Sequence, residues 1–220
     1  MNIKERVAFV ALTVVSATVG GAISGHFLGG STVDAAAHPH TMAAQKFVLT
    51  DMHGKMRGVF DVTDKGVAEI GVYDGGGTLR AGLGVGADGA PALGIYGKDG
   101  KPRAEIGLAG GVARVLLFDG ESNKHVALGV TRDGAAGLAL LDKSGQDRAT
   151  LVLDDSGTPG LRLYDKSGAS RIGVNVTPDN LPGVALLANG KTRAALSLNA
   201  DGAGAITIYD EAGNAKASLP

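Results

Sequence analysis

The chain has 220 residues, with 21 basic and 22 acidic side chains and a net charge of −1. Such a balanced charge leaves no electrostatic footprint for nucleic acid. Cysteine and tryptophan are absent and only 4% of residues are aromatic. Disulfides and thiol chemistry are therefore excluded, and any core must be aliphatic.

The N-terminal stretch from Val7 to Gly30 contains no Asp, Glu, Lys or Arg, whereas Lys4 and Arg6 precede it. About 24 helical residues rising 1.5 Å each are enough to cross a ~30 Å hydrocarbon core. The basic flank places the N-terminus in the cytoplasm. We therefore predict a transmembrane helix in residues 1–30 and a single-pass inner-membrane protein whose remainder lies in the periplasm or at the cell surface.

Small residues recur every four positions in this stretch, which favours close helix–helix association. They are Ala17, Gly21, Gly25 and Gly29. The alternative to an anchor is a signal peptide cleaved near Ala37, which would release a secreted protein. The apolar stretch is longer than a typical signal sequence, so the anchor is favoured.

Residues 31–44 are expected to be a linker. The linker contains His38 and His40, but two imidazoles make an incomplete metal site.

From residue 45 to 220 one unit recurs at a spacing of about 21 to 24 residues, which is typical of repeat proteins. Each unit has two runs of alternating apolar residues joined by an Asp- and Gly-rich stretch, a pattern that predicts two strands and a tight turn. We predict an all-β antiparallel meander of about sixteen short strands in eight hairpin repeats. The units start near Phe47, Ala68, Pro91, Ala113, Ala136, Pro159, Gly183 and Gly204.

A four-residue loop in each hairpin would bring apolar residues opposite each other and a Tyr opposite an Arg. In the second unit the predicted pairs are Ile70–Leu83, Val72–Ala81 and Tyr73–Arg80. In the fifth and sixth units they are Leu138–Leu151, Leu140–Ala149, Leu141–Arg148, Leu161–Val174, Leu163–Ile172 and Tyr164–Arg171.

Shorter Gly-containing loops are expected to link one hairpin to the next. The predicted link pairs are Val85–Leu93, Val130–Leu138, Leu153–Leu161 and Leu198–Ile206. The link from Leu108 to Val115 is one residue shorter, so we expect a bulge or a tighter turn there.

A parallel β-solenoid is the alternative architecture. It would stack residues such as Asp51 and Asp74, or Arg57 and Arg80, directly above each other. Like charges stacked at a strand spacing repel, so the meander is favoured.

The predicted sheet has large aliphatic residues on one face and glycine or alanine on the other. An apolar face must be covered, and large open sheets tend to curl or split. We therefore expect either two packed layers within the chain or completion of the sheet by other copies of the chain.

The unit resembles the YD repeats of bacterial Rhs-type surface proteins in the pairs Tyr73-Asp74, Tyr164-Asp165 and Tyr209-Asp210. The resemblance covers Gln45 to Pro220 and implies an extracytoplasmic hairpin-repeat scaffold. The equivalent pair departs from this pattern elsewhere, for example at Tyr96-Gly97. Rhs shells are far longer and enclose a toxin, which eight units could not do.

No constellation of residues predicts a reaction. His53 and His125 fit variants of the repeat, and Asp154-Asp155 fits a solvated turn. The glycines Gly75–Gly77 precede a predicted strand, whereas a phosphate loop precedes a helix. We therefore predict a protein that is not an enzyme and needs no cofactor or metal.

The predicted function is a membrane-anchored extracytoplasmic scaffold that forms homo-oligomers or docks to a larger membrane assembly. The alternative is a surface binding module for a glycan or a protein partner. Its candidate ligand surface follows the Tyr and Arg positions of the repeat, Tyr73, Arg80, Tyr96, Arg103, Tyr164, Arg171 and Tyr209.

Overall fold

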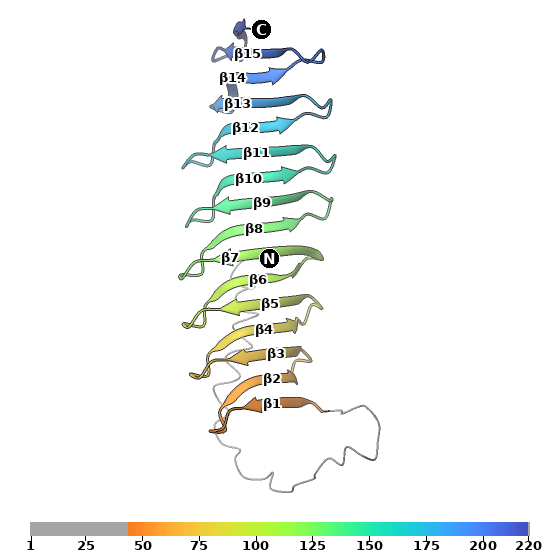
Figure 1. The fold of residues 1–220 in the computed structure, drawn as a ribbon, viewed down its shortest axis with the longest axis vertical. Helices are drawn as coiled ribbons and strands as arrows, with labels where there is room; N and C mark the ends of the chain where they lie inside the picture. Colours follow the sequence, from red (N-terminus) through yellow and green to blue (C-terminus); the bar gives the residue numbers. More distant parts are fainter. Residues whose placement is uncertain (1–43, 220) are drawn as a thin grey trace.

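The computed structural model describes residues 44–219, and these residues form one antiparallel sheet (Figure 1). Sixteen strands follow in chain order, and each pairs with the strands before and after it. This confirms the predicted all-β meander and its strand number, and the antiparallel order rules out a parallel solenoid for these residues. The strands are β1 Lys46–Thr50, β2 Met56–Val62, β3 Ala68–Tyr73, β4 Leu79–Val85, β5 Pro91–Tyr96, β6 Pro102–Ala109, β7 Val112–Phe118, β8 Lys124–Val130, β9 Ala136–Leu141, β10 Asp147–Leu153, β11 Pro159–Tyr164, β12 Ser170–Val176, β13 Pro182–Ala188, β14 Lys191–Leu198, β15 Gly204–Tyr209 and β16 Ala215–Leu219.

The sheet is a single open layer, with strands stacked along one long axis and turns along both sides (Figure 1). All substantial contacts join consecutive strands. The expected folding into two layers within the chain was therefore wrong. Every turn is too short to carry the chain to a second layer. The predicted helix in residues 1–30 and all of the predicted linker except residue 44 lie outside the described residues.

Seven of the eight hairpins close on a three-residue loop, and the hairpin of β13 and β14 closes on the two residues Asn189-Gly190. In the second hairpin the Asp74 N–H donates to the Thr78 carbonyl at 2.9 Å and the Gly77 N–H donates to the Asp74 carbonyl at 3.0 Å. Gly77 has a φ of 85°, a backbone conformation that glycine adopts without a steric cost. This is the common three-residue turn with a left-handed third residue, one residue shorter than the predicted loop.

A β-bulge follows each of these turns, in the second strand of every hairpin. The predicted apolar pairs beyond the bulge are confirmed, among them Val72–Ala81 and Ile70–Leu83. The predicted pairing of Tyr73 with Arg80 was wrong, because Tyr73 lies opposite Leu79 and the bulge absorbs Arg80. The same correction applies to two further pairs, in which Leu141 lies opposite Asp147 rather than Arg148 and Tyr164 opposite Ser170 rather than Arg171.

The links between hairpins also close on three-residue loops, as the Gly86 N–H donating to the Ala90 carbonyl at 2.9 Å shows. Val85 therefore lies opposite Pro91. Pro91 occupies the first position of its strand, where its missing N–H breaks no bond to β4.

The predicted link pairs were consequently wrong by two residues, although each residue keeps its predicted face. The observed pairs are Leu83–Leu93, Leu128–Leu138, Leu151–Leu161 and Leu196–Ile206. The short link after Leu108 is a tighter turn, as predicted, in which Gly110 and Gly111 have φ values of 61° and 84°.

The two faces of the sheet differ in kind. Among the described residues only three hydrophobic side chains are buried, Val59, Tyr96 and Leu141, and all three lie on the face that carries most of the glycines. We call this the small-residue face. The opposite face carries the large aliphatic residues, most of which are exposed, and we call it the apolar face.

Candidate functional site: the uncovered apolar face

A continuous row of large apolar side chains runs down the middle of the apolar face, one from each strand. We call it the central row. Its members are paired across every strand boundary from β1 to β16, so the row has no gap. They are Phe47, Phe60, Ile70, Leu83, Leu93, Ile106, Val115, Leu128, Leu138, Leu151, Leu161, Val174, Val184, Leu196, Ile206 and Leu219.

Two further rows flank the central row on the same face. The hairpin row lies two residues nearer the hairpin turns and comprises Leu49, Gly58, Val72, Ala81, Ile95, Ala104, Leu117, Val126, Leu140, Ala149, Leu163, Ile172, Leu186, Ala194, Ile208 and Ala217. The link row lies two residues nearer the links and comprises Val62, Ala68, Val85, Pro91, Leu108, Ala113, Val130, Ala136, Leu153, Pro159, Val176, Pro182, Leu198 and Gly204. No polar or ionisable side chain belongs to any of the three rows.

Most of the large side chains of these rows lie open to solvent in the isolated chain. Ile106 is 52% exposed, Leu151 53% and Leu196 53%. These positions are the centres of their strands, where a packed sheet would have its core. The face is therefore a core surface without its covering layer.

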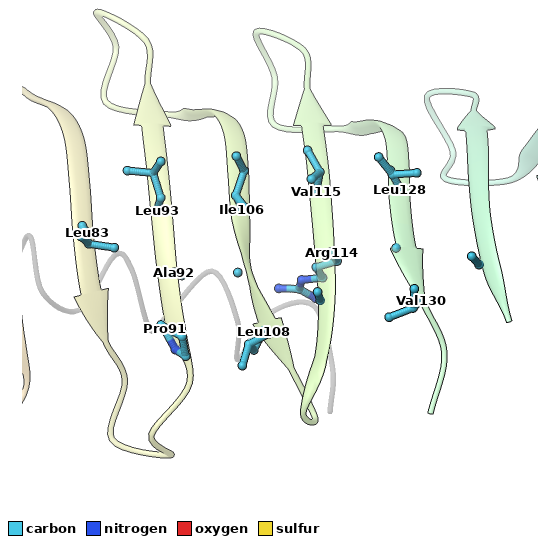
Figure 2. Close-up of a pocket in the computed structure, with 14 residues that line it drawn as sticks. Leu83, Pro91, Ala92, Leu93, Ile106, Leu108, Arg114, Val115, Leu128 and Val130 are labelled. Carbon is cyan, nitrogen blue, oxygen red and sulfur yellow. The ribbon is translucent and has the colours of Figure 1, made fainter. Parts of the chain in front are cut away.

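The apolar face is hollowed along its link side in two shallow grooves. The first runs across β5 to β9, between the central row and the link row, and Figure 2 shows Leu93, Ile106 and Val115 above Pro91 and Leu108. The second repeats this arrangement across β11 to β14. The small residues of the link row, such as Ala113 in the first groove and Pro159 in the second, are among the residues that line each groove.

The opposite side of the molecule carries a line of basic residues, because the extra residue of every bulge is basic. These residues are Arg57, Arg80, Arg103, His125, Arg148, Arg171, Arg193 and Lys216. Most of them lie beside an acid in the turn of the same hairpin, for example Arg171 Nε at 2.6 Å from Asp165 Oδ2. A bulge frees its residue from the ladder and aims the side chain at the turn.

Several of these basic residues also bond the next hairpin. Arg57 Nε donates to the Tyr73 carbonyl at 3.2 Å, and Arg80 Nε donates to the Tyr96 carbonyl at 3.0 Å. His125 Nδ1 lies 3.1 Å from the Leu141 carbonyl. The basic line therefore joins consecutive hairpins, a role that the sequence prediction missed. The available signal was a basic residue six positions after the turn acid in most units.

The turn acids are held as carboxylates. Asp74 Oδ1 accepts hydrogen bonds from the Gly76 and Thr78 N–H groups at 2.8 and 3.0 Å. These bonds, the one from Thr78 above all, lower the pKa of Asp74 below its ordinary value. Asp165 also has a strongly lowered pKa, first through the Ser167 hydroxyl and then through Arg171.

Two tyrosines, Tyr73 and Tyr96, fold over glycines of the small-residue face rather than standing out from it. The ring of Tyr96 covers Gly94 of the same strand, and a Cβ added at Gly94 would lie 2.5 Å from the Tyr96 hydroxyl. Tyr96 is 8% exposed, and burial raises its pKa to about 12. Tyr73 covers Gly71 in the same way.

The structure therefore places the predicted ligand-surface residues on one side of the sheet. Many of their polar groups already interact with other residues of the same chain. Arg80, Arg103 and Arg171 are paired with turn acids. Tyr164 lies with its hydroxyl 3.2 Å from Thr150 Oγ1. Whether this surface binds a ligand stays a prediction. The predicted helix-association residues Ala17, Gly21, Gly25 and Gly29 lie outside the described residues.

Within residues 44–219, no group of three or more His, Asp or Glu side chains is arranged to hold a metal ion. In the same range no helix is long and apolar enough to span a membrane. His53 lies in a hairpin turn, whereas His125 is the bulge residue of β8. His125 Nε2 is 3.0 Å from Asp119 Oδ2, as a variant of the Arg–Asp pair.

No protein-family model matches the chain, and no curated protein matches it by sequence. Among solved structures, the chain is similar to the TCP domain of SAS-4 (dCPAP) from Drosophila melanogaster, whose structure was determined in complex with a proline-rich motif of Ana2 (dSTIL). The TM-score is 0.40 and the identity 12%, over 78% of this chain and 94% of that chain.

Proposed function

We propose that this protein is a non-enzymatic scaffold that assembles through its apolar face. The observation that supports the proposal is the unbroken central row, which crosses all sixteen strands and is exposed on all of them except β7 and β9. Sixteen strands spaced ~4.8 Å apart give a face about 75 Å long and roughly 15 Å wide. Its area of roughly 1,100 Å² is well above the ~300–600 Å² of the largest patch on a typical monomer.

Two such faces would together remove roughly 2,200 Å² from water, which is in the range of obligate homodimers and above standard-sized interfaces. The absence of any charged side chain from the three rows removes the desolvation cost that would oppose such burial. Self-association therefore supplies the missing layer without a further component.

The scaffold is further proposed to be anchored in the inner membrane by residues 1–30, with the sheet in the periplasm or at the cell surface. The support for this part is the uncharged stretch from Val7 to Gly30 behind a basic flank. Cleavage near Ala37, with secretion of the sheet, is the alternative.

The test is the solution mass of the full chain, purified in a mild detergent and measured by sedimentation equilibrium with the detergent density-matched. The proposal predicts assemblies of more than one chain. Leu151→Glu, which places a carboxylate in the central row, should dissociate them. The matched control is Val152→Glu, because Val152 is the next residue and lies on the opposite face. A monomeric wild-type chain would refute the scaffold proposal.

A binding module for a glycan or a protein partner remains the alternative, and it would use the Tyr and Arg positions of the small-residue face. A glycan ligand should raise the melting temperature of the protein. Tyr164→Ala combined with Arg171→Ala should abolish that increase while leaving the mass of the assembly unchanged.

A further inference from the structure

In the two flanking rows of the apolar face, large and small side chains alternate from one strand to the next. The two rows are out of phase, so most strands with a large residue in one row have a small residue in the other. In the hairpin row every odd-numbered strand carries a large residue, from Leu49 to Ile208, and most even-numbered strands carry Ala or Gly. Val126 and Ile172 are the exceptions. In the link row the odd-numbered strands carry only Ala, Pro or Gly, and the even-numbered strands carry only Val or Leu.

This alternation has no packing purpose within one chain. On a single strand the hairpin-row and link-row residues are four positions apart, about 13 Å at 3.4 Å per residue, so their side chains do not meet. Leu117 and Ala113 on β7 are one such pair. The large residue of one row matches the small residue of the other only when two chains lie side by side.

We infer that the apolar face is covered by two further copies of the same chain. The three chains run in the same direction around a common axis along the length of the sheet. In this arrangement the hairpin row of each copy packs against the link row of the next. At odd-numbered strands a Leu, Ile or Val of the hairpin row enters the space above Pro or Ala. At most even-numbered strands a Val or Leu of the link row faces Ala.

The grooves lie where this arrangement needs them. The first groove has Pro91, Ala113 and Ala136 among its lining residues, the small link-row members of β5, β7 and β9. The hairpin-row residues on those same strands are Ile95, Leu117 and Leu140. A second copy in register would therefore present a large side chain to each of these small residues of the groove.

The number three follows from the profile of the face. Two flat sheets pack with a uniform gap of about 10 Å, which needs similar side-chain volume at every row. In a face-to-face pair of these sheets, large side chains would face large side chains along the two central rows. Along the flanking rows, large side chains would face small ones. In a three-sided prism, the space enclosed by the three sheets is widest at the central axis and narrows towards the corners. The large side chains of the three central rows can fill the wide middle. The flanking rows, which place a large side chain against a small one, fit the narrow corners.

The alternation in size also selects another sheet over other coverings. Lipid chains or an amphipathic helix would gain from a continuous large row. A size pattern that repeats with the ~4.8 Å strand spacing is matched by another sheet with the same spacing.

The experiment is a size swap in the full chain in mild detergent, and it rests on the proposed assembly through the apolar face. In the proposed arrangement Leu117 of one chain packs above Ala113 of the next chain. Leu117→Ala removes the large side chain, and Ala113→Leu fills the space that Leu117 occupies in the wild type. Each single variant is expected to weaken assembly by about tenfold or more, because it leaves a cavity or overpacks the interface. The double variant moves the large residue to the neighbouring chain and should recover assembly to within about threefold of wild type.

The matched control combines Leu117→Ala with Ala136→Leu, which fills a position one hairpin away and should recover nothing. Sedimentation equilibrium of the wild type should give the mass of three chains. A two-chain mass, or a swap that recovers no more than the control, overturns this arrangement even where Leu151→Glu still dissociates the assembly. A monomeric wild type overturns both this arrangement and the scaffold proposal.

Discussion

In most hairpins a single turn aspartate performs two structural roles with its two oxygens. In the sixth hairpin, Asp165 Oδ1 accepts the Ser167 and Ala169 N–H groups, and Asp165 Oδ2 faces Arg171. The first contact fixes the turn, and the second holds the basic residue of the bulge. Asp119 and Asp142 repeat this arrangement with His125 and Arg148. Because the contact with the basic residue needs the ionised carboxylate, the fold should be sensitive to acid.

We expect Asp165→Asn to lower the melting temperature at pH 7 and to lose this effect on acidification. The pKa of Asp165 lies below its ordinary 3.8, so the stabilisation by its charge is complete above about pH 4 and disappears as the pH falls through the folded pKa. The amide of Asn still accepts the turn N–H groups, so the difference isolates the ionic contact. The measurement is the melting temperature of both proteins from pH 7 to 2, with Asp155→Asn as control. A difference that stays constant across this range would contradict the assignment.

The glycines under the tyrosine rings should differ from other glycines of the same face. Gly94→Ala is expected to destabilise the protein by about 1 kcal/mol or more, because its Cβ would displace the Tyr96 ring from a buried position. Gly173→Ala is the matched control, since nothing lies within 4 Å of a Cβ added there. Thermal unfolding of both variants measures the difference. Equal stability of the two would show that the ring is not tightly seated.

At the scale of the strands, the alternating apolar residues were enough to predict the number, order and facing of the elements. Pairs such as Ile70–Leu83 follow from the rule that one face must be apolar throughout. The register near the turns did not follow, because a bulge or a three-residue loop shifts pairing without changing the face. The open single layer was not predictable either, since a repeat that pairs only with its neighbours carries no signal for a second layer.

Because Arg80 bonds the next hairpin, its replacement should destabilise the sheet locally, near that bond. Arg80→Met should lower stability by about 0.5–1 kcal/mol, because it removes the bond from Arg80 Nε to the Tyr96 carbonyl, and part of that bond is replaced by water. Amide hydrogen exchange should accelerate mainly in the turn after Tyr96. Lys98→Met, at an exposed position of that turn, is the control. Uniform acceleration along the chain would argue against a local bond between hairpins.

At the scale of the whole molecule, the sheet is a one-dimensional array in which each hairpin is stabilised by its neighbours and by whatever covers the apolar face. Such arrays derive their stability from units and nearest-neighbour interfaces. Because one hairpin contains two strands, its removal keeps the direction and the facing of all later strands. Removal of one strand would reverse the direction of all later strands, so that their hairpin turns and basic bulge residues would move to the edge of the sheet that carries the links.

We therefore expect deletion of residues 136–158, which contain β9 and β10, to give a folded protein. The deletion joins Ala135 to Pro159, and Pro159 takes the place of Ala136 as the first residue of an odd-numbered strand after a link. Because each copy loses one odd and one even strand, the alternation of the flanking rows continues across the junction. The shortened chain should keep the β circular-dichroism spectrum and the number of chains of the wild type. Deletion of residues 136–146 removes β9 alone and moves every later hairpin turn to the opposite edge, which breaks the line of bonds between consecutive hairpins at His125. This protein should melt at a lower temperature than the protein that lacks a whole hairpin. Equal melting temperatures of the two would contradict the view that the two-stranded hairpin is the repeating unit.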